Sequence, residues 1–405
     1  MKNEYDVIIV GAGMVGGALA AAIGNSRLRI CLLDAGKPDV TWPYDEYELR
    51  VSAITKASQT LLNKIGAWDR IVERRCFPYQ KMHVWDATGS GEIHFDCADV
   101  GEACLGHIIE NRVIQGAIID QLHTLPQVDL RFGVRPQSLN INIDGVTLEL
   151  NDDTQLSAKL IVGADGARSW IRDCSDIDTI GWSYQQNGLV TTVTLEETHQ
   201  ETAWQRFLPT GPLAFLPLDE KHCSIVWSTT QDESVRLCGL DEQTFIDELN
   251  TAIGEQGPGK VVAIGKRAAF PLSLQHARDY VRDRVVLVGD AAHTIHPLAG
   301  QGVNLGFLDA ALLAEVLMDA ANAHKDIGQL SVLRRYERGR KADNVMMMSA
   351  MDGFKRLFSN EIKPLSVLRN MGLNLANSVP PLKQLFIQQA MGMRRDLPKL
   401  VRSGH

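Results

Sequence analysis

The glycine-rich segment near the N-terminus holds the first residues whose types and spacing point to chemistry. A β-branched run, VIIV, is followed by Gly11, Gly13 and Gly16 in the pattern G-x-G-x-x-G, where a strand should turn into a helix. The first glycine permits the tight turn, the second lets the backbone approach a pyrophosphate, and the third lets helix pack on strand. The stretch LRICLLD then ends in Asp34, at the distance where a second strand places a carboxylate on a ribose. The segment predicts a dinucleotide site.

Two later glycine-rich clusters add further candidates. The second, VGADGARSWIR, contains Asp165, and either cluster alone could be a strand-end turn. Together they suit a dinucleotide with a long polyol linker, because carboxylates can bind its sugar hydroxyl groups. A helix further along the chain can place its N-terminus against the flavin ring, which becomes anionic when reduced. The order of the clusters therefore predicts FAD. The third cluster, VGDAAHTIHPLAGQGVNLG, holds the candidates Gly289, Asp290, Pro297, Gly300, Gln301, Gly302 and Asn304.

Two histidines of the third cluster are candidate general bases. Histidine is a common general base near neutral pH, so His293 and His296 are candidates, and a role in structuring the loop is the alternative for both. The sequence contains no H-E-x-x-H motif and no Cys/His cluster, so no metal site is predicted. The seven cysteines are scattered and lack a C-x-x-C motif, which favours reduced structural thiols.

The bulk composition is that of a globular protein. The chain has 405 residues, of which 45% are hydrophobic and 22% charged, enough for two or three domains. A net charge of -8 without a basic block argues against nucleic acid as a partner. We expect neither a signal peptide nor a membrane span, because no long uninterrupted apolar stretch occurs. A cytoplasmic protein is expected, with a peripheral position at the inner membrane as the alternative.

The order of the predicted elements indicates an α/β fold. We expect a helix from about Ser52, which would be its N-cap, a hairpin in KMHVWDATGSGEIHFD, and helices in ENRVIQGAIIDQLHTL and DEQTFIDELNTAIG. The runs GLVTTVTLEE, LAFLPL and HCSIVWSTT predict a sheet inserted into a Rossmann-like, glutathione-reductase-type FAD-binding domain. The predicted domains are 1–176 and 276–350 for FAD binding, 177–275 for a β-sheet substrate domain, and 351–405 for a C-terminal helical region.

The three clusters, in this order and spacing, resemble those of the class A flavin-dependent aromatic hydroxylases. GDAAHTIHPLAGQGVNLG resembles the ubiquinone-biosynthesis branch in particular, and within it the enzymes that hydroxylate a 2-polyprenylphenol at ring position 6. The stretches LRVSAI, LGHIIEN, AFLPL, CSIVWS, LRRYERGRK and QAMGMRRDLP match that branch as well. The resemblance covers nearly the whole chain.

The resemblance implies how the adenine side of the cofactor is held. Gly11, Gly13 and Gly16 would hold the ADP half of FAD together with Asp34, where some relatives have glutamate. Arg50, which begins RVSAI, would lie beside the flavin or the pyrophosphate.

The resemblance also implies contacts for the flavin side. Asn111, at a position where many relatives have arginine, would touch the ribityl chain, and Asp165 would lie where a nicotinamide cofactor and the FAD pyrophosphate meet. Asp290 would bind ribityl and phosphate groups. The loop from Pro297 to Asn304 would lie against the isoalloxazine ring.

The implied activity is that of an FAD-dependent monooxygenase. It would hydroxylate the ring of a polyprenylated phenol through a flavin C4a-hydroperoxide, with NADH or NADPH as a transient reductant and O2 as co-substrate. Sister enzymes that hydroxylate demethoxyubiquinone or a 6-methoxyphenol share most of these motifs. A prenyl-lipid flavin reductase or a non-catalytic assembly flavoprotein would carry the same FAD clusters, so both functions are left open.

The aromatic ring of the substrate would bind at the inserted sheet, and its prenyl tail would need a separate apolar surface. Apolar residues at helical spacing in the C-terminal region indicate helices packed on the flavin domain, or a surface for a membrane, a quinone-biosynthesis complex or a partner subunit. A homo-oligomer is left open. The candidates for an apolar slot, with plain sheet core as the alternative, are Phe207, Phe215, Leu216, Pro217 and Trp227.

Overall fold

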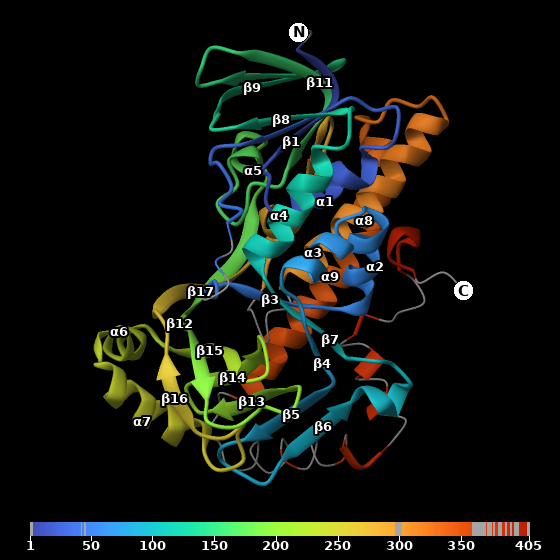
Figure 1. Ribbon diagram of the computed structural model, residues 1–405. Helices are drawn as coiled ribbons and strands as arrows, with labels where there is room; N and C mark the ends of the chain where they lie inside the picture. Colours follow the sequence, from blue (N-terminus) through green and yellow to red (C-terminus); the bar gives the residue numbers. More distant parts are fainter. Residues whose placement is uncertain are drawn as a thin grey trace.

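The computed structural model has two large sheets, one in the upper and one in the lower half of Figure 1, with a small third sheet and helices beside them. It describes residues 3–41, 43, 46–295 and 302–358, followed by 370, 375, 377–379, 383–384, 387–388, 391–392 and 397–402.

A mainly parallel sheet forms the nucleotide-binding half of the molecule. Its strand order is β18-β19-β11-β1-β2-β8, and β10 and β9 extend it from β11. The VIIV run of β1 is buried, with β2 and β11 parallel on either side of it. The strands are β1 (Glu4–Val10), β2 (Ile30–Asp34), β8 (Val128–Phe132), β9 (Pro136–Asn142), β10 (Gly145–Leu150), β11 (Gln155–Gly163), β18 (Val281–Arg282) and β19 (Val285–Leu287).

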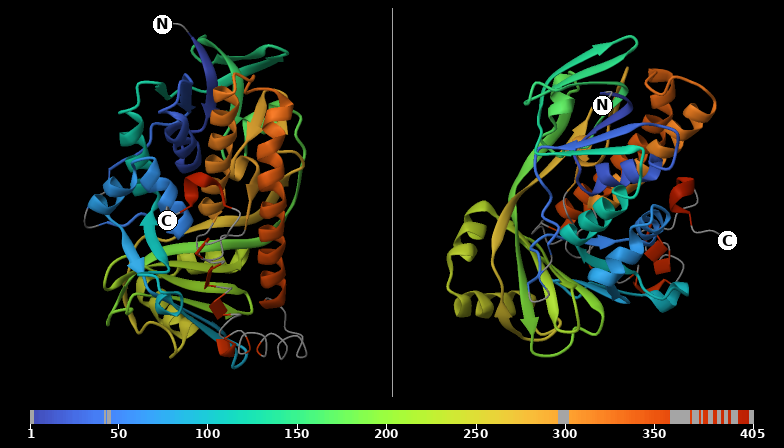
Figure 2. Two further views of the ribbon diagram at one scale, coloured as in Figure 1. Left: turned by 90° about the vertical axis from the view of Figure 1, so that its right-hand side faces the viewer. Right: turned by 45° about the horizontal axis from the view of Figure 1, so that its top comes forward.

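Helices pack against this sheet and one another. α1 contacts α4 and α8, and α8 lies beside α9, as the two long orange helices of Figure 2 show. The sequence prediction of a helix in ENRVIQGAIIDQLHTL is confirmed by α4. These helices are α1 (Met14–Ile23), α3 (Trp68–Arg74), α4 (Asn111–Leu122), α5 (Trp170–Cys174), α8 (Gly302–Asn322) and α9 (Leu330–Phe358).

A small antiparallel sheet leads from the nucleotide half to the second sheet. It consists of β3 (Val51–Ile54), β7 (Gly106–Glu110) and β4 (Phe77–Tyr79), with β7 in the middle. The prediction that Ser52 caps a helix is wrong, because Ser52 pairs with Ile109 inside β3. Helix α2 (Lys56–Lys64) begins later, and the hydroxyl of Thr55 accepts its capping hydrogen bond.

The second sheet is mainly antiparallel, and helices α6 (Gln231–Gly239) and α7 (Glu242–Ile253) cover one face of it. The predicted hairpin is confirmed, since β5 pairs with β6, and β5 also runs parallel to β13. The strands are β5 (Lys81–Asp86), β6 (Glu92–Asp96), β12 (Thr179–Leu195), β13 (Thr202–Leu208), β14 (Gly211–Pro217), β15 (His222–Thr230), β16 (Val261–Ile264), β17 (Ala268–Ala277) and β20 (His293–Thr294).

The predicted α/β fold class is confirmed. The second sheet draws on the hairpin 81–96 as well as on the inserted segment, and the long strands β12 and β17 connect it to the nucleotide half (Figure 1). The numerical domain bounds stay a prediction. Across the described residues, no helix combines the length and apolar character needed to cross a membrane. All seven cysteines are free.

Candidate active site

The predicted cofactor residues gather at one edge of the parallel sheet. Gly11 directly follows β1, Asp34 ends β2, Asp165 follows β11 by two residues, and Gly289 follows β19 by two residues. These strands are parallel neighbours, so their carboxyl ends meet at the same edge. That edge is where open α/β sheets bind nucleotides.

The three glycines of the first cluster each meet a different geometric demand. Gly11 has a φ of 108°, and a Cβ there would lie 2.2 Å from the carbonyl oxygen of Ala164. A Cβ on Gly16 would lie 2.0 Å from the carbonyl oxygen of Gly11. Gly13 caps α1, and among the residues that the structure describes none has an atom within 4 Å of a Cβ built there. The turn, the close packing and the exposed helix N-terminus therefore fit a pyrophosphate.

The Asp34 carboxylate holds the glycine loop from the neighbouring strand. Its Oδ2 accepts a hydrogen bond of 2.8 Å from the backbone N–H of Ala12, and its Oδ1 accepts one of 2.8 Å from Gly36. The side chain of Gln115 on α4 donates to the Ala12 carbonyl oxygen, also at 2.8 Å. Each carboxylate oxygen can accept a second hydrogen bond, so a ribose hydroxyl can bind Asp34 without disturbing the loop.

Arg50 and Asn111 lie next to each other because β3 pairs with β7. The backbone N–H of Asn111 donates to the Arg50 carbonyl oxygen at 3.0 Å, and Ser52 Oγ lies 2.7 Å from Asn111 Oδ1. Within the described part of the chain the Asn111 amide nitrogen makes no hydrogen bond. It can therefore donate to a polyol hydroxyl, as the predicted ribityl contact requires.

Asp290 follows β19 at the same edge of the parallel sheet. Its side chain is open to solvent, although protein surrounds it on its other sides. This loss of surrounding water raises the pKa of the carboxyl, while the charges of His293 and Arg50 act to lower it. Arg50 and Asp290, distant in sequence, are therefore within electrostatic reach of each other at the predicted cofactor site.

The Asp165 side chain is committed to its own loop. Its Oδ1 accepts a 2.5 Å hydrogen bond from Ser169 Oγ, and its Oδ2 accepts one of 3.1 Å from the backbone N–H of Ile171. Burial raises the pKa of the Asp165 carboxyl, and these hydrogen bonds act against that rise. The cofactor contact of Asp165 stays a prediction.

His293 belongs to a buried polar network. The side chain is 2% exposed, and its Nε2 lies 2.5 Å from Oδ2 of Asp309, which is completely buried. Asp309 also accepts hydrogen bonds from Arg340 Nε at 2.8 Å and from the backbone N–H of Gly289 at 3.1 Å. Through the bond from Gly289, this network anchors the turn at Gly289. That favours the loop-structuring role of His293 over the role of a general base.

Asn304 fastens the start of α8 to the small sheet. Its Nδ2 donates to the Ala53 carbonyl oxygen at 2.8 Å, and its Oδ1 accepts from Ser58 Oγ at 2.7 Å and from the backbone N–H of Thr55 at 3.1 Å. Gly302 is the first residue of α8. The remaining candidates of the third cluster lie outside the described residues: His296, Pro297, Gly300 and Gln301.

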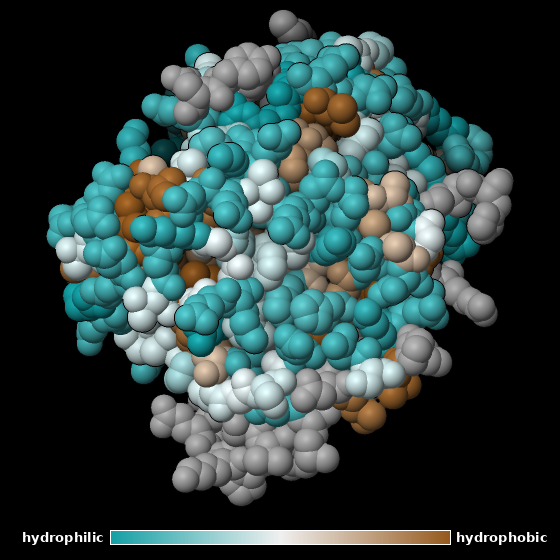
Figure 3. Space-filling view, turned by 60° about the horizontal axis from the view of Figure 1, so that its bottom comes forward, coloured by the Kyte–Doolittle hydropathy of each residue, from teal (hydrophilic) through white to brown (hydrophobic). Residues whose placement is uncertain are grey.

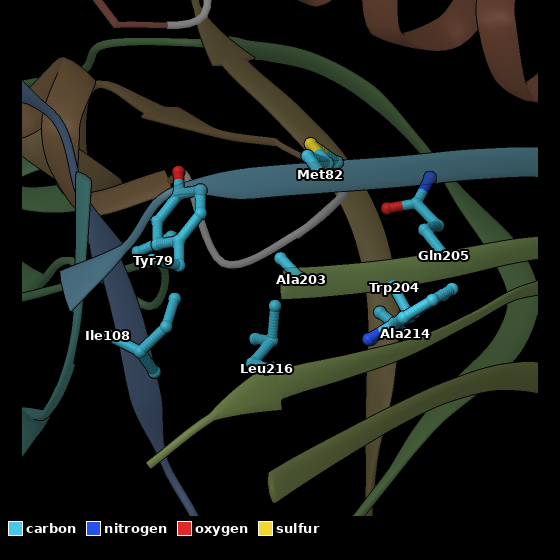
Figure 4. A pocket seen from close by; sticks show the side chains of 9 residues that line it. Tyr79, Met82, Ile108, Ala203, Trp204, Gln205, Ala214 and Leu216 are labelled. Carbon is cyan, nitrogen blue, oxygen red and sulfur yellow. The ribbon is translucent and has the colours of Figure 1, made fainter. Parts of the chain in front are cut away.

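An apolar cavity lies between the small sheet and the second sheet. Figure 4 shows the ring of Tyr79 at one end of it and the amide of Gln205 at the other. Both residues are buried, and neither side chain makes a hydrogen bond within the described part of the chain. The cavity is lined by Ala53, Tyr79, Met82, Ile108, Ala203, Trp204, Gln205, Ala214 and Leu216.

The predicted substrate residues fall on different faces of the second sheet. Leu216 lines the cavity, but Phe215 and Trp227 pack in the core under α6 and α7. Neighbouring residues of a strand point to opposite faces, which separates Phe215 from Leu216. Phe207 packs with Val84 of the hairpin and Pro217 is buried at the end of β14, so for these four residues the plain-core alternative describes their packing.

Sequence reasoning missed Tyr79, Met82 and Ile108, which reach the cavity from segments between the first and second glycine clusters. It also missed Gln205, a buried polar residue of β13. Alternation along this strand places Gln205 between the apolar residues Ala203 and Phe207 on one face, and this pattern could have marked it as facing a site. Nothing local marks the other three residues as members of that site.

Comparison with known proteins identifies the family of this chain. Residues 4–349 match the family model described as FAD binding domain. The ubiquinone biosynthesis monooxygenase COQ6, mitochondrial, of Danio rerio is 40% identical, over 95% of this chain and 89% of that protein. The 3-demethoxyubiquinol 3-hydroxylase of Escherichia coli (strain K12) is 37% identical, over 97% of this chain and 100% of that protein.

Solved structures of lower identity share the fold. The p-nitrophenol 4-monooxygenase PnpA from Pseudomonas putida DLL-E4 superimposes with a TM-score of 0.79 at 20% identity, over 98% of this chain and 100% of that one. At this identity the likeness shows the fold alone.

The chain belongs to the FAD-binding-domain family, and it is an FAD-dependent monooxygenase. Within that family its curated relatives include hydroxylases of ubiquinone biosynthesis, so the resemblance seen in the three glycine-rich clusters is confirmed. The polar groups of the candidate site fit FAD. They are a glycine turn open to a pyrophosphate, a carboxylate at the end of β2, and an Asn111 amide nitrogen that no described residue binds.

Proposed function

We propose that the protein hydroxylates the aromatic ring of a polyprenylated phenol in ubiquinone biosynthesis, converting a 2-polyprenylphenol into its 6-hydroxy product. FAD supplies the oxygen-activating chemistry when bound, with NADH or NADPH as the reductant and O2 as co-substrate. The names of the curated relatives support this class of substrate. Hydroxylation of a demethoxyubiquinol is the second candidate, because the relative of that name is matched over its whole length.

The observation that carries the proposal is the position of the apolar cavity. Ala53 is a wall of the cavity, and its carbonyl oxygen is bound by Asn304 in the first turn of α8. The same strand, β3, directly follows Arg50. The cavity has a volume of about 10 Å³, room for about one water molecule, so its lining side chains must move apart to admit a ring. A ring held there would lie beside the elements that carry the predicted flavin contacts. That proximity is what oxygen transfer to a ring carbon requires.

The cavity lining suits a phenol. Its walls are mainly apolar and keep water away from the reacting atoms. Burial raises the pKa of the Tyr79 hydroxyl, so this group stays protonated at neutral pH and can donate a hydrogen bond. We propose that the Tyr79 O–H or the Gln205 N–H binds the phenolic oxygen. A donor there stabilises negative charge on that oxygen and so makes the ring a better nucleophile.

For the location we propose peripheral contact with a membrane through the C-terminal region, since the prenyl tail of the substrate is a lipid. Leu375 is 59% and Val379 36% exposed, whereas Ile387 and Met391 are buried against the residues around the cavity. Figure 3, a view from the lower side, shows separate apolar groups among hydrophilic side chains. Flotation with anionic lipid vesicles tests this: Leu375→Ser should reduce co-flotation, and undiminished flotation would argue against the proposal.

The experiment that tests the function is mass spectrometry of the lipids in a host that lacks the gene. Accumulation of a polyprenylphenol without an added ring oxygen, reversed when the protein is restored, is the expected result. Accumulation of a demethoxyquinone would select the second candidate. An unchanged quinone profile would overturn the ubiquinone assignment.

Oxygen consumption by the purified holoenzyme distinguishes a hydroxylase from proteins that do not hydroxylate. A hydroxylase consumes O2 in proportion to the polyprenylphenol supplied and forms an oxygenated product. A prenyl-lipid reductase would oxidise the nicotinamide without incorporating oxygen. An assembly flavoprotein would do neither.

A further inference from the structure

The hairpin β5–β6 carries two histidines and a glutamate side by side, on the face of β5 opposite to the cavity residue Met82. His83 and His94 are direct cross-strand partners, and Glu92 precedes His94 by two residues, so the three side chains share one face. Nε2 of His83 lies 3.2 Å and Nε2 of His94 lies 3.4 Å from the same oxygen, Oε2 of Glu92. All three donor atoms lie within 4.8 Å of one another.

These separations are those of ligands around one small cation. Zinc binds nitrogen and carboxylate oxygen at about 2.0–2.2 Å, so two ligands of a tetrahedral ion lie roughly 3.3 Å apart. Two imidazoles with one carboxylate form a donor set that suits zinc and its first-row neighbours. Three protein ligands leave a fourth position for water.

The sheet holds the three side chains in place. His83 is 7% exposed, and its ring stacks on that of His94 with centroids 3.9 Å apart and an angle of 23° between the planes. Trp85 and Trp204 flank the His83 ring, with centroids at 4.8 Å and 5.3 Å. To bind one ion, the exposed His94 ring would have to turn out of this stack, because an imidazole nitrogen binds a metal in the plane of its ring.

We propose that His83, Glu92 and His94 form a binding site for a divalent zinc-type cation, with water completing the coordination. The sequence predicted no metal site because no linear motif of ligands occurs, and a pairing across two strands leaves no such motif. A bound ion would fasten the edge strand β6 to β5. Met82, next to His83, lines the cavity from the other face of β5.

Zinc titration of the untagged, FAD-loaded protein tests the proposal. After removal of metal with a chelator, calorimetry should detect one zinc ion bound per chain. His94→Ala and Glu92→Gln should each weaken binding by roughly tenfold or more, since each removes a ligand. His123→Ala, which changes an exposed histidine at the end of α4, is the matched control and should bind as the wild type does.

Tryptophan fluorescence provides a second reading at the site itself. Co2+ in place of Zn2+ should quench the emission of the wild type, because Trp85 and Trp204 lie beside His83, and should quench His94→Ala much less. Retained FAD absorbance shows that each variant is folded. The proposal is overturned if the wild type binds no zinc, or if His94→Ala and Glu92→Gln both bind it with unchanged affinity.

Discussion

The side-chain nitrogen of Asn304 donates a 2.8 Å hydrogen bond to the carbonyl oxygen of Ala53, and this bond joins the first turn of α8 to a wall of the apolar cavity. The start of α8 and the wall of the cavity at Ala53 are therefore joined through one buried amide, and a shift of one relative to the other would break this hydrogen bond.

Replacing Asn304 with alanine should destabilise the protein and loosen FAD. The change removes hydrogen bonds to Ala53, Thr55 and Ser58 in a buried site, and we expect a loss of about 2–3 kcal/mol in the free energy of unfolding. Denaturant unfolding and the FAD content of the purified protein measure both effects. Asn322→Ala, at the exposed end of α8, should change neither. Equal losses in the two variants would contradict the assigned role.

The glycines of the first cluster should respond differently to alanine. Gly11→Ala places a Cβ against Ala164 in a backbone conformation that favours glycine, so we expect little folded protein. Gly13→Ala meets no protein atom, so the protein should fold but bind FAD more weakly because the methyl group obstructs the pyrophosphate. Flavin absorbance per chain and thermal unfolding separate the two outcomes. Gly239→Ala, which also meets open space, serves as the control. Full FAD binding by Gly13→Ala would count against the pyrophosphate site.

Substituting Gln205 should impair substrate binding more than flavin binding. Gln205→Leu removes a polar group from the cavity, and we expect the KM for a polyprenylphenol to rise by roughly tenfold, the equivalent of one hydrogen bond. The amount of product formed per nicotinamide oxidised should fall as well, because less of the activated oxygen is transferred to a poorly positioned ring. Steady-state kinetics with product quantification check both. Gln243→Leu, exposed on α7, should behave as the wild type; an unaltered KM in Gln205→Leu would remove Gln205 from the site.

Acid should destabilise the protein in part through Asp309. Burial by itself raises the pKa of this carboxyl, but the charges and hydrogen bonds of His293 and Arg340 outweigh burial and lower the pKa to about 2. The unfolded value is about 3.9, so the contribution to stability is complete above pH ~4 and is lost as the pH falls toward 2. Its size is on the order of 2–3 kcal/mol. Urea unfolding between pH 5 and pH 3 should show a smaller pH dependence for Asp309→Asn, and an identical dependence would contradict this assignment.

Local sequence was enough to predict the nucleotide half. A buried β-branched strand, three spaced glycines and a carboxylate at the end of the next strand form a single β-α-β unit, so local spacing was enough to predict it, although Gly11 and Gly16 also pack against the distant Ala164. The β5–β6 hairpin followed from its alternation for the same reason. Ser52 shows the limit, because pairing with Ile109 on a distant strand decided that its segment became β3 and not the start of a helix.

The tertiary structure alone decided which side chains share a site. Alternation in β14 separates Phe215 from Leu216, but only the packing of α6 and α7 decides which of the two faces the cavity. The fold places His293 on the buried Asp309, sixteen residues further along the chain, which favours the loop-structuring alternative for this residue. Tyr79 and Gln205 likewise meet at one cavity although they lie on different strands, β4 and β13. The sequence determines the chemistry that each side chain can provide. Contacts between distant segments determine which residues that side chain touches, because burial and strand pairing depend on the whole fold.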